Sequence, residues 1–141
     1  MVGSCAQAVN ASTSVIAMVR RRPVLACFPM STGCLFCSII AGEIPARILD
    51  QTDSAVAFAD INPQAPTHVL VVPKTHHEDV GALADDPASL QGVMALAARI
   101  GRESGERGFR LVFNTGPDAG QSVQHAHGHV LAGRTLQWPP G

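Results

Sequence analysis

Three histidines, His125, His127 and His129, alternate with small residues and are followed by an apolar run. In a β-strand, side chains two positions apart share a face and lie about 7 Å apart, so the spacing predicts a row of imidazoles. Such a row could chelate a metal ion. It could also divide the roles of nucleophile, proton carrier and orienting group, because imidazole is nucleophilic and titrates near neutral pH. An inert surface strand is the third interpretation, and the strict spacing disfavours it.

The loop before these histidines is rich in glycine and small polar residues. Gly116, Gly120 and Ser122 lie in it, and Asn114 and Asp118 add polar side chains. Glycines let successive backbone N–H groups converge on an anion, and a serine hydroxyl can donate to an oxygen. Beside a histidine nucleophile, such a loop indicates a phosphate ligand, which a simple metal chelate would not need. A loop that only reverses the chain is the alternative.

Cys34 and Cys37 form a C-x-x-C pair. This spacing occurs in structural zinc sites, but a tetrahedral site needs two more ligands. The alternatives are two reduced cysteines without metal, or a redox pair, which the lack of a surrounding βαβ pattern disfavours. Because no secretory pattern precedes the pair, we expect a cytoplasmic protein without a disulfide framework.

Length and composition limit the function classes. A chain of 141 residues with 46% apolar and 15% charged residues predicts one globular domain. The net charge of −1 gives no reason to expect nucleic acid as a partner. No apolar run approaches the roughly 20 residues of a membrane span, so we expect no membrane partner either.

Residues 1–30 differ in kind from the rest of the chain. Residues 1–42 contain three arginines and no acidic residue. We interpret residues 1–30 as a poorly ordered N-terminal extension and residues 31–141 as the domain. A transit peptide is the alternative, whereas a secretory signal would have its basic residues before the apolar stretch.

The elements that must position these residues alternate between helix and strand patterns. Asp86 predicts the N-cap of a long helix from Pro87 to about Glu103. We expect one face of this helix to carry Leu90, Val93, Met94, Ala97 and Ile100. The remaining expectations are short helices at 34–40 and 79–84, a hairpin of 46–51 with 55–60, and strands at 68–73, 109–114 and 125–132. Together they predict an α+β domain on a mostly antiparallel sheet.

Four segments resemble segments of the histidine triad (HIT) family, and in particular of its Hint branch, and they occur along the chain in the same order as in the family. HAHGHVL resembles the family signature of three histidines alternating with apolar residues, and NTGPDAGQSV resembles its phosphate loop. ADINPQAPTHVLVVPKTH resembles its nucleoside segment, and WPPG its C-terminal end. The resemblance covers roughly residues 33–141. It implies a HIT-like fold, with a roughly five-stranded mostly antiparallel sheet, one long helix and one or two short helices.

The resemblance implies a role for each site residue. His127 would attack the α-phosphorus of a nucleoside monophosphate ester or amide, and water would then hydrolyse the nucleotidyl-histidine. His129 would contact the phosphate, Ser122 would protonate the leaving group, and His68 would support the triad. Asp60 would accept the ribose hydroxyls. The phosphate would be held by Asn114, Gly120, Gln121 and Val123, and the base by Phe36, Ile39, Ile44, Phe58 and Leu70.

Bacterial-type members of the family complete the cysteine pair with two histidines, which correspond here to His76 and His125. The resemblance thus implies a structural zinc ion on Cys34, Cys37, His76 and His125, and no organic cofactor. His77 is the alternative third ligand, and the spacing favours His76. The chain departs from the family at Gly128, usually an apolar position, and at Gln124, where relatives often carry an aromatic residue.

These features predict a hydrolase of nucleoside 5′-phosphoramidates, adenosine above all, or of related adenylated compounds. The alternatives are a dinucleoside polyphosphate hydrolase of the Fhit type and a nucleotide-binding adaptor with little turnover. A metal-dependent enzyme with an H-x-H chelate would leave the phosphate loop and Asp60 unexplained. The expected ligand is a purine nucleotide containing AMP. The resemblance also implies a homodimer joined through the long helix and a sheet edge, which would cover an exposed strand.

Overall fold

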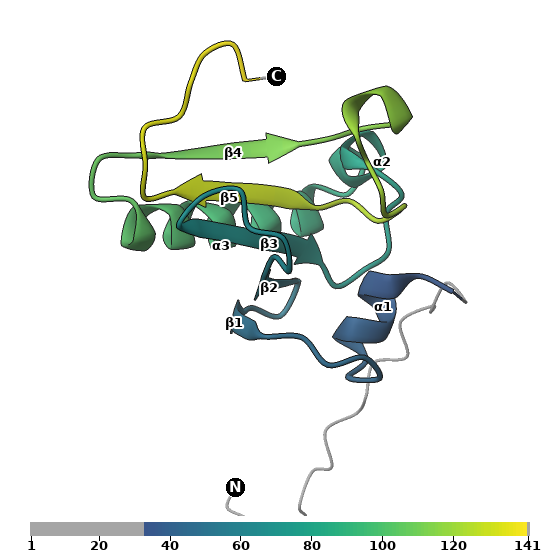
Figure 1. The fold of residues 1–141 in the computed structure, drawn as a ribbon. Helices are drawn as coiled ribbons and strands as arrows, with labels where there is room; N and C mark the ends of the chain where they lie inside the picture. The colour runs from purple at the N-terminus through teal and green to yellow at the C-terminus, as the bar shows by residue number, and fades with distance from the viewer. Residues whose placement is uncertain (1–32, 141) are drawn as a thin grey trace, which may run out of the picture.

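The computed structural model describes residues 33–140 (Figure 1), and the extension predicted for residues 1–30 lies outside them. The elements in chain order are α1 (Leu35–Ile40), β1 (Ile48–Gln51), β2 (Ala55–Ala59), β3 (Thr67–Pro73), α2 (Val80–Ala84), α3 (Pro87–Ser104), β4 (Phe109–Phe113), the 3₁₀ turn η1 (Pro117–Ala119) and β5 (Gly128–Ala132). Among the described residues, no helix is both long and apolar enough to cross a bilayer.

The strands form a five-stranded sheet in the order β1-β2-β3-β5-β4, and every neighbouring pair is antiparallel. The prediction of a five-stranded antiparallel sheet with one long helix and short helices is therefore confirmed. β1 and β2 form the predicted hairpin. β5 enters between β3 and β4, so that the strand carrying the last histidine lies inside the sheet and β4 lies at its edge.

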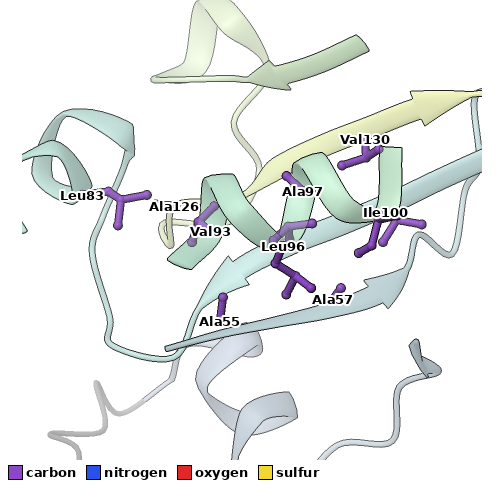
Figure 2. Close-up of a cluster of buried hydrophobic side chains, with 11 residues drawn as sticks. Ala55, Ala57, Leu83, Val93, Leu96, Ala97, Ile100, Ala126 and Val130 are labelled. Atoms are coloured by element: carbon purple, nitrogen blue, oxygen red, sulfur yellow. The ribbon is translucent and has the colours of Figure 1, made fainter. Parts of the chain in front are cut away.

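Helix α3 covers one face of the sheet and encloses the main core (Figure 2). Asp86 caps the helix as predicted, because its carboxylate accepts a hydrogen bond from the Ser89 N–H at 3.2 Å. The core includes Val93, Ala97 and Ile100, but Met94 is 44% exposed and the prediction that it lies on the buried face is wrong. Leu96 takes the inward position instead: the buried residues 93, 96, 97 and 100 share one helical face, and residue 94 lies at its outer edge.

The opposite face of the sheet carries a second apolar cluster, which packs against α1. It consists of Phe36, Val56, Phe58, Leu70 and Val72. Alternation along β2 and β3 sends successive side chains to the two clusters, since Ala55, Ala57, Val69 and Val71 belong to the core under α3. Leu70 pairs with His129, so His129 shares the α1 face with the second cluster.

The strand predicted for residues 125–132 begins only at Gly128, and of the three histidines only His129 lies in it. Gly128 pairs with Phe113, the last residue of β4, and with Val71 of β3. Beyond this point β4 has turned into the glycine-rich loop and no longer offers a partner. The Ala126 N–H instead donates to the carbonyl of His77 at 2.7 Å, so His125 and His127 lie on irregular chain that is pinned by other contacts.

Gly128 lies where the sheet has no room for a side chain. An added Cβ would lie 2.8 Å from Cζ of Phe113 and 2.9 Å from Cδ1 of Leu111. Side chains from β4 therefore occupy the space that a side chain at position 128 would need.

We predict that Gly128→Ala lowers the free energy of unfolding by about 1–3 kcal/mol, because the new methyl group overpacks this contact. Urea denaturation followed by circular dichroism would measure the change. Phe113→Leu shortens the opposing side chain, so the double variant should lose less stability than the sum of the two single losses. Strict additivity of the two losses would contradict this account of Gly128.

Candidate functional site

A chain of hydrogen bonds joins two histidines on the α1 face of the sheet. The Gln64 N–H donates to Nδ1 of His68 at 3.0 Å, and Nε2 of His68 lies 2.9 Å from Nδ1 of His129. Because His68 Nδ1 accepts, its proton lies on Nε2, which donates to His129 Nδ1. The proton of neutral His129 therefore lies on Nε2.

His129 presents this N–H without a partner. Its Nε2 is buried and makes no hydrogen bond to any described residue. Burial and the neighbouring His127 and His68 lower the pKa of His129 to about 4, so the ring is neutral at pH 7. A buried unpaired donor is costly, and an acceptor on a bound ligand would remove that cost.

His127 is oriented by the backbone. Its Nδ1 lies 2.7 Å from the carbonyl oxygen of His125, to which it donates, so Nε2 carries the lone pair. The ring centroids of Phe36 and His129 lie 5.1 Å and 5.0 Å from that of His127 and fix its plane on two sides. The result is a nucleophilic nitrogen next to a hydrogen-bond donor.

Cys34, Cys37, His76 and His125 meet beside the triad, with one potential ligand atom from each within 4.8 Å of the others. Nδ1 of His125 lies 3.4 Å from Cys34 Sγ and 3.6 Å from Cys37 Sγ, and Nδ1 of His76 lies 3.5 Å from Cys37 Sγ. The S-to-N edge of a tetrahedral zinc site is about 3.6 Å, given the usual zinc–ligand lengths. The four residues therefore fit zinc in both chemistry and spacing.

The second nitrogen of His125 supports the same assignment. Nε2 donates to the carbonyl of Pro73 at 2.9 Å, which leaves the lone pair on Nδ1, the atom that faces the sulfurs. Burial lowers the pKa of His125 to about 4 and keeps the ring neutral. His77 lies outside this cluster, and its Nε2 faces the carboxylate of Asp86 at 3.3 Å.

The predicted phosphate loop turns through two glycines with positive φ, Gly116 at 81° and Gly120 at 79°. Such a conformation suits glycine, because a Cβ would be strained there. Ser122 is exposed, and it lines an open hollow of about 490 Å³ together with Cys34 and His76. Gln121 is buried, and its side chain bonds to the backbone on both sides of the loop. A larger trough near the α3–β4 turn contains none of the predicted site residues.

Only some of the residues predicted to bind the nucleoside lie close together. Phe36, Phe58 and Leu70 are buried together and Ile39 packs against them, whereas Ile44 is 38% exposed and lies outside the cluster. Asp60 uses one carboxylate oxygen to accept from the Asn62 N–H at 2.7 Å, and the other lies 3.4 Å from Nε2 of His68. Asn114 is half-buried where β4 runs into the loop.

Several orienting groups were not predicted from the sequence. They are the backbone N–H of Gln64 and the carbonyls of Pro73 and His125, whereas Gln121 was predicted to hold the phosphate and not to orient the backbone. The backbone groups carry no sequence signal, since every residue has them.

The chain resembles known proteins over most of its length. The HIT domain family model matches residues 41–136. A 14 kDa zinc-binding protein from Zea mays is 40% identical over 111 residues, which cover 76% of this chain and 87% of the maize protein. Adenylylsulfatase HINT1 from Arabidopsis thaliana is 33% identical over 132 residues, which cover 91% of this chain and 90% of the plant protein.

The fold also matches solved structures. A HIT family hydrolase from Legionella pneumophila Philadelphia 1 superposes with a TM-score of 0.73 at 44% identity, covering 77% of this chain and 99% of the other. The family model, the relatives and the shared antiparallel sheet agree with one another. The chain therefore belongs to the histidine triad (HIT) family.

Proposed function

We propose that this protein hydrolyses adenosine 5′-phosphoramidates or related adenylated compounds through a nucleotidyl-histidine intermediate. The observation that carries the proposal is the lone pair on Nε2 of His127 beside the unpartnered N–H of His129. The likeness to a HIT family hydrolase supports the hydrolase class. The plant relative named adenylylsulfatase supports a substrate with an adenylyl group.

In the first step, His127 Nε2 attacks the α-phosphorus and forms an N–P bond while the bond to the leaving amine or alkoxide breaks. The ring becomes cationic, and its Nδ1–H still donates to the His125 carbonyl, which stabilises the new charge. The His129 N–H donates to a phosphate oxygen as negative charge builds there. Ser122 donates a proton to the leaving group.

In the second step, water attacks phosphorus and gives one proton back to the Ser122 oxygen, and the N–P bond breaks, which returns the lone pair to His127 and releases the nucleoside monophosphate. Asn114 and the backbone at Gly120 and Val123 hold phosphate oxygens during both steps. Asp60 accepts a ribose hydroxyl, and the base lies against Phe36 and its neighbours, whose apolar side chains suit a purine.

We predict that His127→Ala lowers kcat for an adenosine phosphoramidate by on the order of a thousandfold or more, because no other group takes the place of the nucleophile. AMP should still bind to the variant, as measured by calorimetry. Mass spectrometry of wild-type protein quenched in base during turnover should detect one adenylyl group, and this adduct should be absent from the variant. Turnover of the variant at the wild-type rate would refute the assignment.

A substrate panel separates the alternatives. It should include an adenosine phosphoramidate, an aminoacyl-adenylate and a dinucleoside polyphosphate. Preference for the dinucleotide would favour the polyphosphate hydrolase. AMP binding by the wild type without turnover of any member would favour the adaptor.

The cysteine–histidine cluster is proposed as a structural zinc site, held by Cys34, Cys37, His76 and His125. The spacing of the donor atoms and the name of the maize relative support it. When bound, zinc would cross-link α1 to the chain that enters β5, and hydrolysis would proceed at His127 without it as a participant. Thiolate ligands agree with the cytoplasmic location predicted from the sequence.

We predict that the purified protein carries one zinc ion per chain, measured by plasma mass spectrometry, and that His76→Ala loses it. At free zinc a thousandfold above Kd, binding adds about 4 kcal/mol of stability, so chelation should lower Tm clearly. His77→Ala is the matched control, because the neighbouring histidine faces Asp86, and this variant should keep the metal. Loss of zinc from His77→Ala alone would reverse the ligand assignment.

The homodimer is proposed on the basis of the outer edge of β4, which pairs with no further strand among the described residues. β4 lies at the edge of the sheet, with Phe109 37% exposed, and Met94 is 44% exposed on α3. Pairing of β4 with its copy would cover both the strand edge and apolar surface.

Light scattering coupled to size exclusion should give the mass of a dimer, and Met94→Glu should shift it toward the monomer because a charge would be buried. Ile61→Glu adds the same charge at a fully exposed apolar residue in the loop after β2 and should leave the mass unchanged. A monomeric wild-type protein at micromolar concentration would contradict the proposed dimer.

A further inference from the structure

The side chain of Gln121 joins three segments of backbone around the candidate site. Its Oε1 accepts from the Gly116 N–H at 2.9 Å, and its Nε2 donates to the carbonyls of Glu78 at 2.7 Å and Val123 at 3.1 Å. Its own backbone N–H donates to the Gly116 carbonyl at 3.1 Å. A residue only 7% exposed thus holds the start of the glycine-rich loop, the segment after β3 and the approach to the histidines together.

These bonds leave Gln121 little to offer a nucleotide. A primary amide has two N–H donors, and both are used on backbone carbonyls, while its oxygen already accepts one bond. The backbone N–H is also taken. The geometry therefore disagrees with the role of direct nucleotide contact that the resemblance implied for this residue.

Residues 121–126 form an arch that is fixed at both ends on consecutive carbonyls. Gln121 Nε2 holds the Glu78 carbonyl at one end, and the Ala126 N–H holds the His77 carbonyl at the other. Within the arch, the His125 N–H donates to the Val123 carbonyl at 2.8 Å. Ser122 follows directly after the first fixed point and is exposed.

We infer that Gln121 is a positioning residue, which fixes the arch so that Ser122 Oγ faces the leaving group. This inference rests on the proposed function, because it assigns Gln121 a part in the proton transfer by Ser122. The amide acts on the backbone alone and does not touch the substrate. Without it, the Gln121 end of the arch would keep only the backbone hydrogen bond to the Gly116 carbonyl, and Ser122 would sample positions from which it cannot donate.

The leaving group provides a signature that a general loss of structure would not produce. An aliphatic amine or alkoxide must be protonated as it departs, whereas p-nitrophenolate is stable as an anion and needs no proton. Misplacement of Ser122 should therefore slow cleavage of an adenosine alkylphosphoramidate and spare the p-nitrophenyl ester of AMP.

The test compares Gln121→Met and Gln121→Glu with Ser122→Ala on these two substrates. Methionine keeps the length of the side chain without its hydrogen bonds, and glutamate keeps the acceptor for Gly116 but loses both donors. Both Gln121 variants should lower kcat for the alkylphosphoramidate by roughly tenfold to a hundredfold and change kcat for the p-nitrophenyl ester by less than about threefold. KM for both substrates should stay near the wild-type value. Gln91→Glu, an exposed residue on α3, is the matched control for the charge and should behave as wild type.

A double-variant cycle tests the route through Ser122. Because Gln121 acts on the serine, Gln121→Met combined with Ser122→Ala should be no slower on the alkylphosphoramidate than Ser122→Ala alone. Equal losses on both substrates, multiplicative losses in the double variant, or a rise in KM shared by both substrates would overturn the positioning role. Failure of the proposed function is a separate result, because the wild type itself would then cleave neither substrate.

Discussion

The hydrogen bond from His127 Nδ1 to the carbonyl of His125 is the contact on which the candidate chemistry depends. It decides which ring nitrogen keeps a lone pair, and a histidine in the other tautomer would present an N–H to phosphorus. Hydrogen bonds fix the tautomers of His68 and His129 in the same way. The Gln64 N–H donates to His68 and the His68 ring donates to Nδ1 of His129, so the proton of His129 lies on Nε2. The site therefore holds one acceptor and one donor side by side, set by hydrogen bonds with backbone groups and a neighbouring ring.

The alternation of side chains along the strands places this arrangement and the apolar core on opposite faces of the sheet. Side chains of β2 and β3 that point toward α3 are small or β-branched and close the core, as Ala55, Ala57 and Val71 do. The next residues along the same strands point to the α1 face and supply Phe58, Leu70 and His68. Because His68 and His129 lie on the α1 face, the apolar core under α3 is kept separate from the rings of the candidate site. Gly128 contributes to the same separation of the two faces, because its lack of a side chain leaves space for Phe113 beneath the histidines.

The sequence predicted the elements and the grouping of the site better than its fine geometry. Period-two and helical repeats, with the Asp86 cap, located the strands and α3. The C-x-x-C spacing together with the family resemblance led to a cluster of cysteines and histidines that the structure brings together. The start of β5 was placed too early, because strand pairing depends on whether β4 continues alongside, which residues 125–127 do not encode. Met94 was misplaced because an apolar residue near the edge of a helical face can turn outward. The tautomers could not be predicted, since backbone carbonyls from Pro73 and His125 set them.

His125 contacts both parts of the site, the cysteine–histidine cluster and His127. Its ring directs Nδ1 at both sulfurs and Nε2 at the Pro73 carbonyl, so the side chain is fixed from two sides. Its main-chain carbonyl is the acceptor that orients His127. Any force that holds the ring of His125 therefore also holds the carbonyl on which the tautomer of His127, the proposed nucleophile, depends. Phe36 strengthens the link, because it lies between the two cysteines in sequence and packs its ring on both His125 and His127. A metal on this cluster would thus shape the nucleophile through backbone and packing alone, without entering the reaction.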